Sequence, residues 1–272
     1  MVNILNITRY AIKNTQLIPW VKFIWQIDVA KADLHYKLLP TDSIDVILNL
    51  ADNMVYETEG DKIVAPSFHI NGLRSRYSFI HQADTIRIFG ISFYPYGLYP
   101  FVHTSLKKLH DKLANLYEVA PILGQGFEKA VANESNDKIL SEIEQVLINE
   151  LTINQGFMEK ARLISDFMAI EDGTSVKSFC SERAINIKTL ERMFLYYTGY
   201  TPKVLRCIKR FQNASNQLMY QQSASLTDIT YWNSFTDQSH FIKEFTRFSG
   251  TTPCTFQSEK ITVKENAKYT YI

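Results

Sequence analysis

Apolar and polar residues alternate along much of the first hundred residues, which is the pattern of a β-strand with one buried face. Aromatic and β-branched residues are frequent in the same segments, as they are in strands generally. Groups of turn-forming residues separate these segments from one another. The predicted strands are 20–28, 43–50 and 85–94, and the predicted turns are 51–53, 59–61 and 71–72. The N-terminal part of the chain is therefore predicted to be β-rich.

From Leu106 onward the apolar residues are spaced by three and four, the period of a helix with one buried face. The segment 104–153 is therefore predicted to be helical, with a loop near Gly124 and Gly126. A polar junction follows at 154–156, and no strand pattern is found after it. The predicted domains are 1–154 and 155–272, the second of them all-α.

Two segments of the second domain, 186–202 and 237–253, repeat one pattern at a constant offset of 51 residues. Each begins with an Asn or Asp suited to cap a helix N-terminus and continues with apolar residues at a spacing of four. Each ends with glycine and then Thr-Pro, which close one helix and begin the next. A short helix is predicted before each repeat, at 175–183 and 226–233. The sequence therefore predicts two helix-turn-helix motifs in tandem.

A continuous helix is predicted between the repeats, over 202–222, because its apolar residues keep helical phase. About twenty helical residues span ~30 Å, close to the ~34 Å between successive major-groove faces of B-DNA. One rigid helix of this length can hold two recognition helices one DNA turn apart. A seven-helix bundle that binds a protein is the alternative interpretation of the same pattern.

Charge is distributed unevenly, although the whole chain has a net charge of only +1. The segment 174–214 contains eight basic and two acidic residues. Such a local excess of positive charge favours an anionic partner, nucleic acid first. A solvated helix face is the alternative explanation for the same residues.

The C-terminal half closely resembles AraC/XylS-type transcription regulators. The segment 228–253, DITYWNSFTDQSHFIKEFTRFSGTTP, is similar to the second helix-turn-helix of that family, and 190–194, LERMF, resembles its first recognition helix. The resemblance covers roughly 157–257. It implies a monomeric, two-headed, seven-helix unit that binds double-stranded DNA. The protein is expected to be a bacterial regulator, with RNA polymerase as a further partner.

The same resemblance, carried over by position, implies which side chains face DNA. They are Lys188, Thr189, Glu191 and Arg192 in the first recognition helix, and Gln238, Ser239, His240 and Lys243 in the second. Their chemistry agrees, because Arg and Lys can read guanine, Gln can read adenine and Glu can accept from cytosine. Lys203, Lys209 and Arg210 are expected to contact phosphates or to hold the helical scaffold together.

Two departures from the family pattern concern the tight turns and the helices before them. The family has glycine in each turn, where this chain has Ala184 and Ser234, residues that are strained at positive φ, so a different turn geometry is expected. The small alanine of each first helix is replaced by Cys180 and Thr230. Both are still small, so close helix packing is expected, with Cys180 as a core residue rather than a nucleophile.

The N-terminal half resembles, more loosely, an uncharacterised domain found upstream of AraC-type DNA-binding domains. The resemblance implies a β-rich sensor or dimerisation module followed by helices; in better-known relatives this position holds a cupin-like barrel that binds a small effector. The aromatic segment 93–99 is interpreted either as a pocket wall or as a packed corner. His35, His69 and His81 lack the spacing of metal ligands, so structural roles are expected for them.

The overall fold class is therefore predicted to be α+β, and the function that of a sequence-specific DNA-binding regulator. Control is expected from a small-molecule effector or from self-association as a homodimer, with 139–151 as a candidate dimer surface. The alternative is an interaction module whose N-terminal domain binds a protein partner. We find no catalytic or cofactor motif, no signal peptide and no membrane-spanning stretch, and three cysteines without a CxxC pair are typical of a reduced, cytoplasmic protein.

Overall fold

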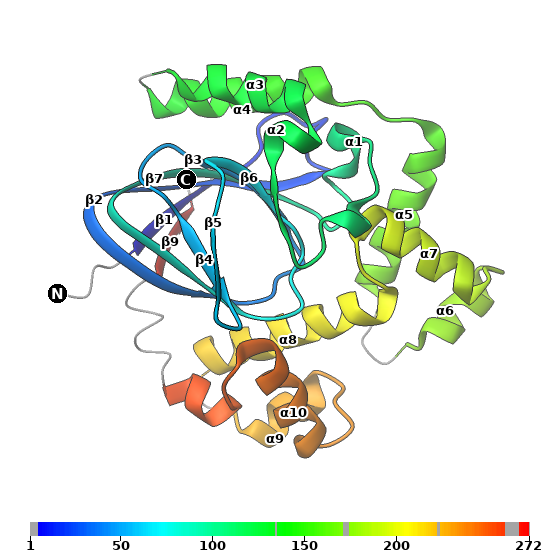
Figure 1. Ribbon diagram of the computed structural model, residues 1–272. Coiled ribbons are helices and arrows are strands. Elements are labelled where there is room, and N and C mark those ends of the chain that lie inside the picture. The colour runs from blue at the N-terminus through cyan, green and yellow to red at the C-terminus, as the bar shows by residue number, and fades with distance from the viewer. Residues whose placement is uncertain (1–4, 134, 171–173, 222–223, 259–266, 272) are drawn as a thin grey trace.

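A curved β-sheet forms the N-terminal part of the chain, and helices cover one of its faces before the helical C-terminal part begins (Figure 1). The computed structural model describes residues 5–133, 135–170, 174–221, 224–258 and 267–271. The strands are β1 (Leu5–Tyr10), β2 (Val21–Leu38), β3 (Ile44–Asn49), β4 (Val55–Thr58), β5 (Asp61–Val64), β6 (Phe68–Asn71), β7 (Ser78–Phe93), β8 (Leu113–Asn115) and β9 (Ala267–Tyr271).

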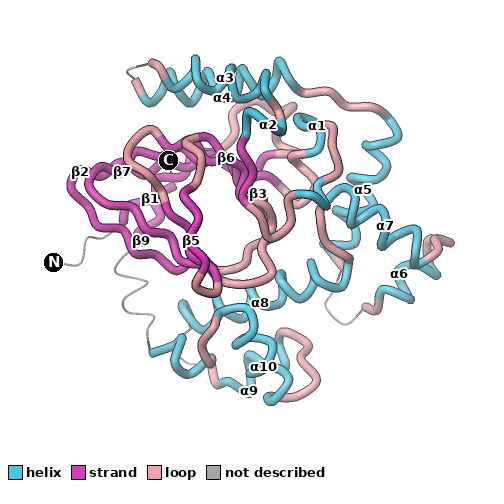
Figure 2. Tube along the Cα trace, viewed as in Figure 1, coloured by secondary structure: helices cyan, strands magenta, loops and turns pink. Residues whose placement is uncertain are grey.

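The helices, which are cyan in Figure 2, fall into two groups along the chain. The first group is α1 (Tyr99–Val102), the 3-10 turn η1 (Leu106–Lys108), α2 (Leu116–Val119), α3 (Pro121–Val131) and α4 (Asn136–Glu150). The second is α5 (Gln155–Ala169), α6 (Val176–Glu182), α7 (Ile187–Thr198), α8 (Pro202–Tyr220), α9 (Leu226–Trp232) and α10 (Gln238–Ser249), followed by helical residues 253–258. The predicted combination of a β-rich part and a helical part with tandem helix-turn-helix motifs is confirmed.

The long strand β7 organises the sheet, because it pairs with β2 along one edge and with β3 and β4 along the other. The sheet order is β8-β6-β3-β7-β2-β1-β9, with β4 and β5 as a side hairpin. Two register shifts in β2, between Val21 and Phe23 and between Val29 and Ala32, mark bulges. Bulges increase the local twist of a strand, and the sheet curls accordingly (Figure 1).

Both faces of the strand β3 are buried, because its alternate side chains enter two different apolar clusters. Val46 and Leu48 of β3 belong to the large cluster that includes residues of the helices, whereas Ile47 belongs to a smaller, separate cluster with Ile86 and Ile88. This arrangement explains why the predicted strand 43–50 alternates only imperfectly. A strand with two buried faces needs apolar residues at successive positions.

The region from 104 to 115 was predicted to be helical, and that prediction is wrong. Leu106 lies in the short turn η1, and Leu113 begins the strand β8, which pairs with β6 through Leu113 and Asn71. The predicted loop near Gly124 and Gly126 is also wrong, because both glycines lie inside α3. They permit close packing: a Cβ at 126 would lie 2.7 Å from a methyl carbon of Val146 in α4.

The apolar face of α4 packs inside the chain. Ile139, Ile143 and Leu147 are all 0% exposed, since they lie against the main apolar cluster. Of the two uses of this face that the sequence allowed, packing within one chain or a dimer surface, the structure shows the first.

The aromatic segment 93–99 is a packed corner between the two halves of the chain. Trp20 stacks on Phe157 of α5 with ring centroids 5.4 Å apart, and Tyr99 lies 4.7 Å from both Phe157 and Tyr197 of α7. Tyr96 meets Trp20 edge to face at 6.2 Å. These contacts attach the helix-turn-helix region to the sheet.

The last described strand, β9, was not predicted. Residues 267–271 run parallel to β1, with Leu5 opposite Ala267 and Arg9 opposite Tyr271. The chain therefore returns to the N-terminal sheet after the helical domain, and β9 lies beside β1 (Figure 1). The expectation that no strand follows residue 157 is corrected by this pairing.

Candidate nucleic-acid interface

Each recognition helix begins at a side-chain cap that the repeat predicted. The Asn186 side chain accepts a hydrogen bond from the backbone N–H of Lys188 at 2.9 Å, and Asp237 accepts one from His240 at 2.8 Å. Such caps satisfy N–H groups that have no partner inside the helix. The helices α7 and α10 end at Gly199 and Gly250, both left-handed, with φ of 86° and 73°. The predicted caps are confirmed at all four positions.

The two tight turns keep a left-handed residue although neither contains glycine. Ala184 and Ser234 both have a φ of 52°, and the residue after each donates its backbone N–H to the first helix of its unit. The bonds run from Ile185 to the Cys180 carbonyl at 2.9 Å and from Phe235 to the Thr230 carbonyl at 3.0 Å. The expected change of turn geometry is therefore not found, because the surrounding packing imposes the same turn on alanine and serine.

Equivalent apolar residues fill the core of both units. Leu190 and Phe194 in α7 are 0% exposed, and Phe241 and Phe245 in α10 are 0% and 1% exposed. Cys180 and Thr230 are also buried, as expected of small residues at a close helix contact. Burial raises the pKa of the Cys180 thiol, and the negative charge of Glu191 raises it further. The side chain therefore stays in the unreactive thiol form.

The predicted base-reading side chains lie on the outer faces of the two recognition helices. On α7 all four are exposed; on α10 three of the four are exposed and His240 is half-buried. The exposed set is Lys188, Thr189, Glu191, Arg192, Gln238, Ser239 and Lys243. His240 differs because its Nε2 atom lies 3.6 Å from the Glu244 carboxylate. The arrangement leaves one face of each recognition helix open for a ligand.

The three predicted phosphate contacts have different surroundings. Lys203 is exposed at the start of α8. Lys209 donates its Nζ to the Met168 carbonyl at the end of α5, and Arg210 forms an ion pair with Glu244 of α10 at 2.6 Å. Lys209 and Arg210 therefore make contacts that hold helices together, and phosphate contact stays a prediction for all three residues.

Arg210 holds the second unit together through several contacts at once. Its Nε atom donates to Glu244 Oε1 at 3.1 Å, its guanidinium lies 4.4 Å from the centroid of the Phe235 ring, and its Nη1 atom donates to the Ser234 carbonyl at 3.4 Å. One side chain of α8 thus fixes both the tight turn and α10. The sequence alone places Arg210 in a basic segment, whereas the structure shows that its guanidinium is paired with the Glu244 carboxylate.

Some exposed side chains near the interface were not singled out by the sequence. Tyr231 and Trp232, at the end of α9, are 70% and 57% exposed. Arg247 is exposed in the last turn of α10, at the repeat position that Tyr196 occupies in α7. The sequence repeat could have pointed to Arg247, because its offset of 51 residues aligns Arg247 with Tyr196 on the first recognition helix.

The histidines of the N-terminal part have structural partners. His69 is 0% exposed, with Nδ1 2.7 Å from the Pro66 carbonyl and Nε2 3.1 Å from the Tyr56 hydroxyl. Burial lowers the pKa of His69 to about 4, so the ring is neutral. His81 lies 3.1 Å from Glu57 and meets the His35 ring edge to face. In the described part of the chain, no group of three or more His, Cys, Asp or Glu side chains could hold a metal ion.

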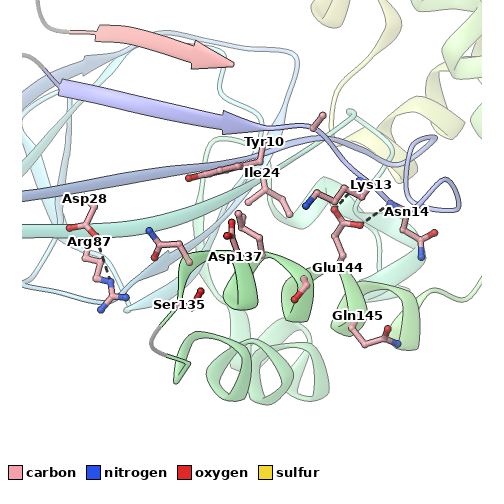
Figure 3. Close-up of a pocket in the computed structure, with 14 residues that line it drawn as sticks. Tyr10, Lys13, Asn14, Ile24, Asp28, Arg87, Ser135, Asp137, Glu144 and Gln145 are labelled. Carbon is pink, nitrogen blue, oxygen red and sulfur yellow. Dashed lines mark hydrogen bonds and ion pairs between the residues drawn. The ribbon is translucent and has the colours of Figure 1, made fainter. Parts of the chain in front are cut away.

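A groove of about 990 Å³ lies between the sheet and α4. Figure 3 shows Tyr10, Asp28 and Arg87 of the strands on one side and Asp137 and Glu144 on the other. The Glu144 carboxylate accepts from the backbone N–H groups of residues 13 and 14, at 3.0 and 2.8 Å, which ties α4 to the segment before β2. The groove therefore carries charges of both signs, part of them already paired.

Two segments of the chain match known protein families. Residues 14–115 match a domain of unknown function, DUF6597, and residues 179–259 match a helix-turn-helix domain. The helix-turn-helix match covers most of α6 through α10. Within the described residues, no helix combines the length and apolar character needed to cross a membrane.

A curated relative and several solved structures are similar to this chain. The HTH-type transcriptional regulator RipA of Corynebacterium glutamicum is 30% identical over 104 residues, which are 38% of this chain and 31% of the relative. The match thus spans about a third of that relative. ToxT from Vibrio cholerae O395 is 13% identical, with a TM-score of 0.44 over 86% of this chain and 95% of that one. The AraC-like transcriptional activator CuxR is 15% identical, with a TM-score of 0.31 over 78% and 81%.

Proposed function

We propose that residues 179–259, which match a helix-turn-helix domain, are an AraC-type DNA-binding domain, and that the chain is a transcription regulator that reads one DNA site through two recognition helices. The reading residues in this proposal are the exposed ones of α7 and α10, with Lys203 on a phosphate. A regulator of this kind acts in the cytoplasm, where bacterial DNA lies. Its chemistry is binding, so we assign it no catalytic step and no cofactor.

The observation that carries the proposal is the duplication of local geometry. The caps at Asn186 and Asp237, and the left-handed turns at Ala184 and Ser234, present two helices in the same way. Between them α8 has 19 residues and is about 28 Å long. That length is close to one turn of B-DNA, which suits two heads that enter successive major grooves.

We further propose that the N-terminal part of the chain controls the two helix-turn-helix units, α6–α7 and α9–α10, which we call the two heads. It touches the end of each recognition helix: Gly199 packs against the Leu106 carbonyl, and Gly250 packs against the Tyr77 ring. A signal that moves these contacts would shift the population between arrangements that fit DNA and arrangements that do not. A small-molecule effector or a second copy of the chain can supply that signal, and RNA polymerase is the expected downstream partner.

Selection of bound sequences from a random duplex library, with the full-length chain, tests the proposal. Enrichment of a common motif supports sequence-specific DNA binding. Recovery of a random population, with binding that depends on salt but not on sequence, would contradict it, because phosphate contacts alone carry no sequence information.

A further inference from the structure

A cleft of about 430 Å³ lies where the N-terminal part meets the helix-turn-helix domain. One wall comes from the turns beside the sheet, with Glu59, Arg76 and Tyr77. The other wall comes from the helical domain, with Tyr200 before α8 and Arg247 in the last turn of α10. The volume is within the range of ~300–1,000 Å³ found for small-molecule sites.

The charged groups of this cleft are mostly positive. It is lined by two guanidinium groups, Arg76 and Arg247, and by one carboxylate, Glu59, which pairs with Arg76. The Arg247 guanidinium lies 4.4 Å from the centroid of the Phe248 ring, a contact that leaves its N–H groups available to a ligand. Guanidinium groups bind carboxylates and phosphates through paired N–H donors. The lining is therefore suited to an anion.

The Tyr200 side chain is a neutral part of the same lining. Tyr200 is 7% exposed, and its hydroxyl is buried beside the side chains of Asp111 and Ser75. The Asp111 carboxylate accepts from the backbone N–H and the hydroxyl of Ser75, at 2.6 and 2.8 Å. Burial first, and then Asp111, raise the pKa of Tyr200, so its hydroxyl keeps its proton. Tyr200 therefore adds no negative charge that would repel an anion.

We propose that this cleft binds a small organic anion, whose carboxylate or phosphate lies between Arg76 and Arg247. The apolar body of the ligand packs against the Tyr77 ring. This inference rests on the proposed function, since an occupant that touches both walls ties the N-terminal part to α10. Binding there fixes the second head relative to the sheet and thereby changes affinity for DNA.

Titration of the full-length protein with benzoate and with phenyl phosphate, followed by ligand-observed NMR, tests the proposal. Benzyl alcohol, which has the ring without the charge, is the ligand control. The variants are Arg76→Gln and Arg247→Gln. Lys62→Gln is the matched control, because Lys62 is an exposed cation on β5 outside the cleft. Arg76 has 58% of its side chain exposed, so its replacement leaves the fold intact.

We expect at least one of the two anions to bind the wild-type protein, and benzyl alcohol not to bind. Arg76→Gln and Arg247→Gln each weaken binding roughly tenfold, as expected for the loss of a charge-assisted hydrogen bond. Lys62→Gln binds like the wild type. Failure of both anions to bind, or equal weakening by Lys62→Gln, overturns the proposal.

The same preparations are tested for sequence-selective DNA binding, which separates this inference from the function on which it rests. Selective DNA binding without anion binding overturns the anion site and leaves the DNA-binding function in place. Anion binding without selective DNA binding supports the site and contradicts the proposed function.

Discussion

Gly250 ends α10 against the aromatic ring of Tyr77, so closely that a Cβ atom at position 250 would lie 2.3 Å from Cε1 of that ring. The equivalent glycine of the first unit, Gly199, lies against the Leu106 carbonyl oxygen, 2.9 Å from where its Cβ would be. Both recognition helices thus end on the N-terminal part of the chain. The glycines serve two purposes, since each has a positive φ and each permits a close contact between the halves.

Gly250→Ala is expected to lower the free energy of unfolding by roughly 1–3 kcal/mol, from strain at positive φ and from the clash with Tyr77. Gly60→Ala is the matched control, since Gly60 has a φ of 92° and nothing within 4 Å of its Cβ position. Urea denaturation measures both. Equal losses in the two variants would contradict the account of a contact at Tyr77, and Tyr77→Ala should recover part of the loss in Gly250→Ala.

Ala184→Gly is expected to stabilise the protein, because an alanine at a φ of 52° is strained and glycine is not. The gain should be roughly 0.5–1 kcal/mol, since the greater freedom of glycine in the unfolded chain offsets part of it. Ala169→Gly, at an exposed position at the end of α5, should have the opposite sign. Thermal melting of both variants decides the point: a loss of stability in Ala184→Gly would contradict the turn geometry.

The Arg210–Glu244 pair is expected to stabilise the second unit, because its side chains are only 18% and 10% exposed. Arg210→Ala leaves the Glu244 carboxylate largely buried without its partner and should cost about 2–4 kcal/mol in urea denaturation. Arg183→Ala is the comparison, since its pairs with Asp166 and Glu182 lie at 3.9 and 3.7 Å on the surface, where such pairs contribute ~1 kcal/mol or less. Similar costs for the two variants would show that Arg210 is not part of the scaffold.

Stability should fall as the pH is lowered from about 6.5 to 4, because His69 is held neutral in the folded state. Its pKa is lowered from 6.5 to about 4 by burial. Between these values the unfolded chain binds more protons than the folded one, so acid favours unfolding. The slope approaches about 1.4 kcal/mol per pH unit for this one group.

His69→Gln tests this assignment, since glutamine has no titrating group in the range. The free energy of unfolding is measured by urea denaturation at several pH values. The variant should be less stable at pH 7 but should show a shallower dependence below pH 6.5. An unchanged slope would mean that other groups cause the acid sensitivity. His81→Gln is the control, because His81 is half-buried on the strand β7 and is paired with Glu57.

The features that the sequence predicted correctly are local ones. Caps such as Asn186 and Asp237 act within three residues, so a repeated pattern of caps and apolar spacing was enough to place both helix-turn-helix motifs. The candidate reading residues followed from position on these helices. Their exposure agrees with the assignment, whereas their contact with DNA stays a prediction.

The features that the sequence did not predict depend on distant partners. Gly126 appeared to break a helix, yet it allows α3 to approach Val146 of α4. Arg210 appeared to belong to a basic surface, yet its partner Glu244 lies 34 residues further along the chain. The strand β9 pairs with β1 from the other end of the sequence. In each case the local pattern fits two structures, and packing between remote segments decides between them.

The central claim is that two equivalent heads read two parts of one DNA site, and sequence selection with the wild type, Arg192→Ala and Lys243→Ala tests it most directly. The account predicts a motif of two blocks about 10 bp apart for the wild type. Arg192→Ala should erase base preference within one block and Lys243→Ala within the other, each at a cost of ~1–3 kcal/mol. A single block in the wild type, or loss of the same block in both variants, would contradict the two-headed account.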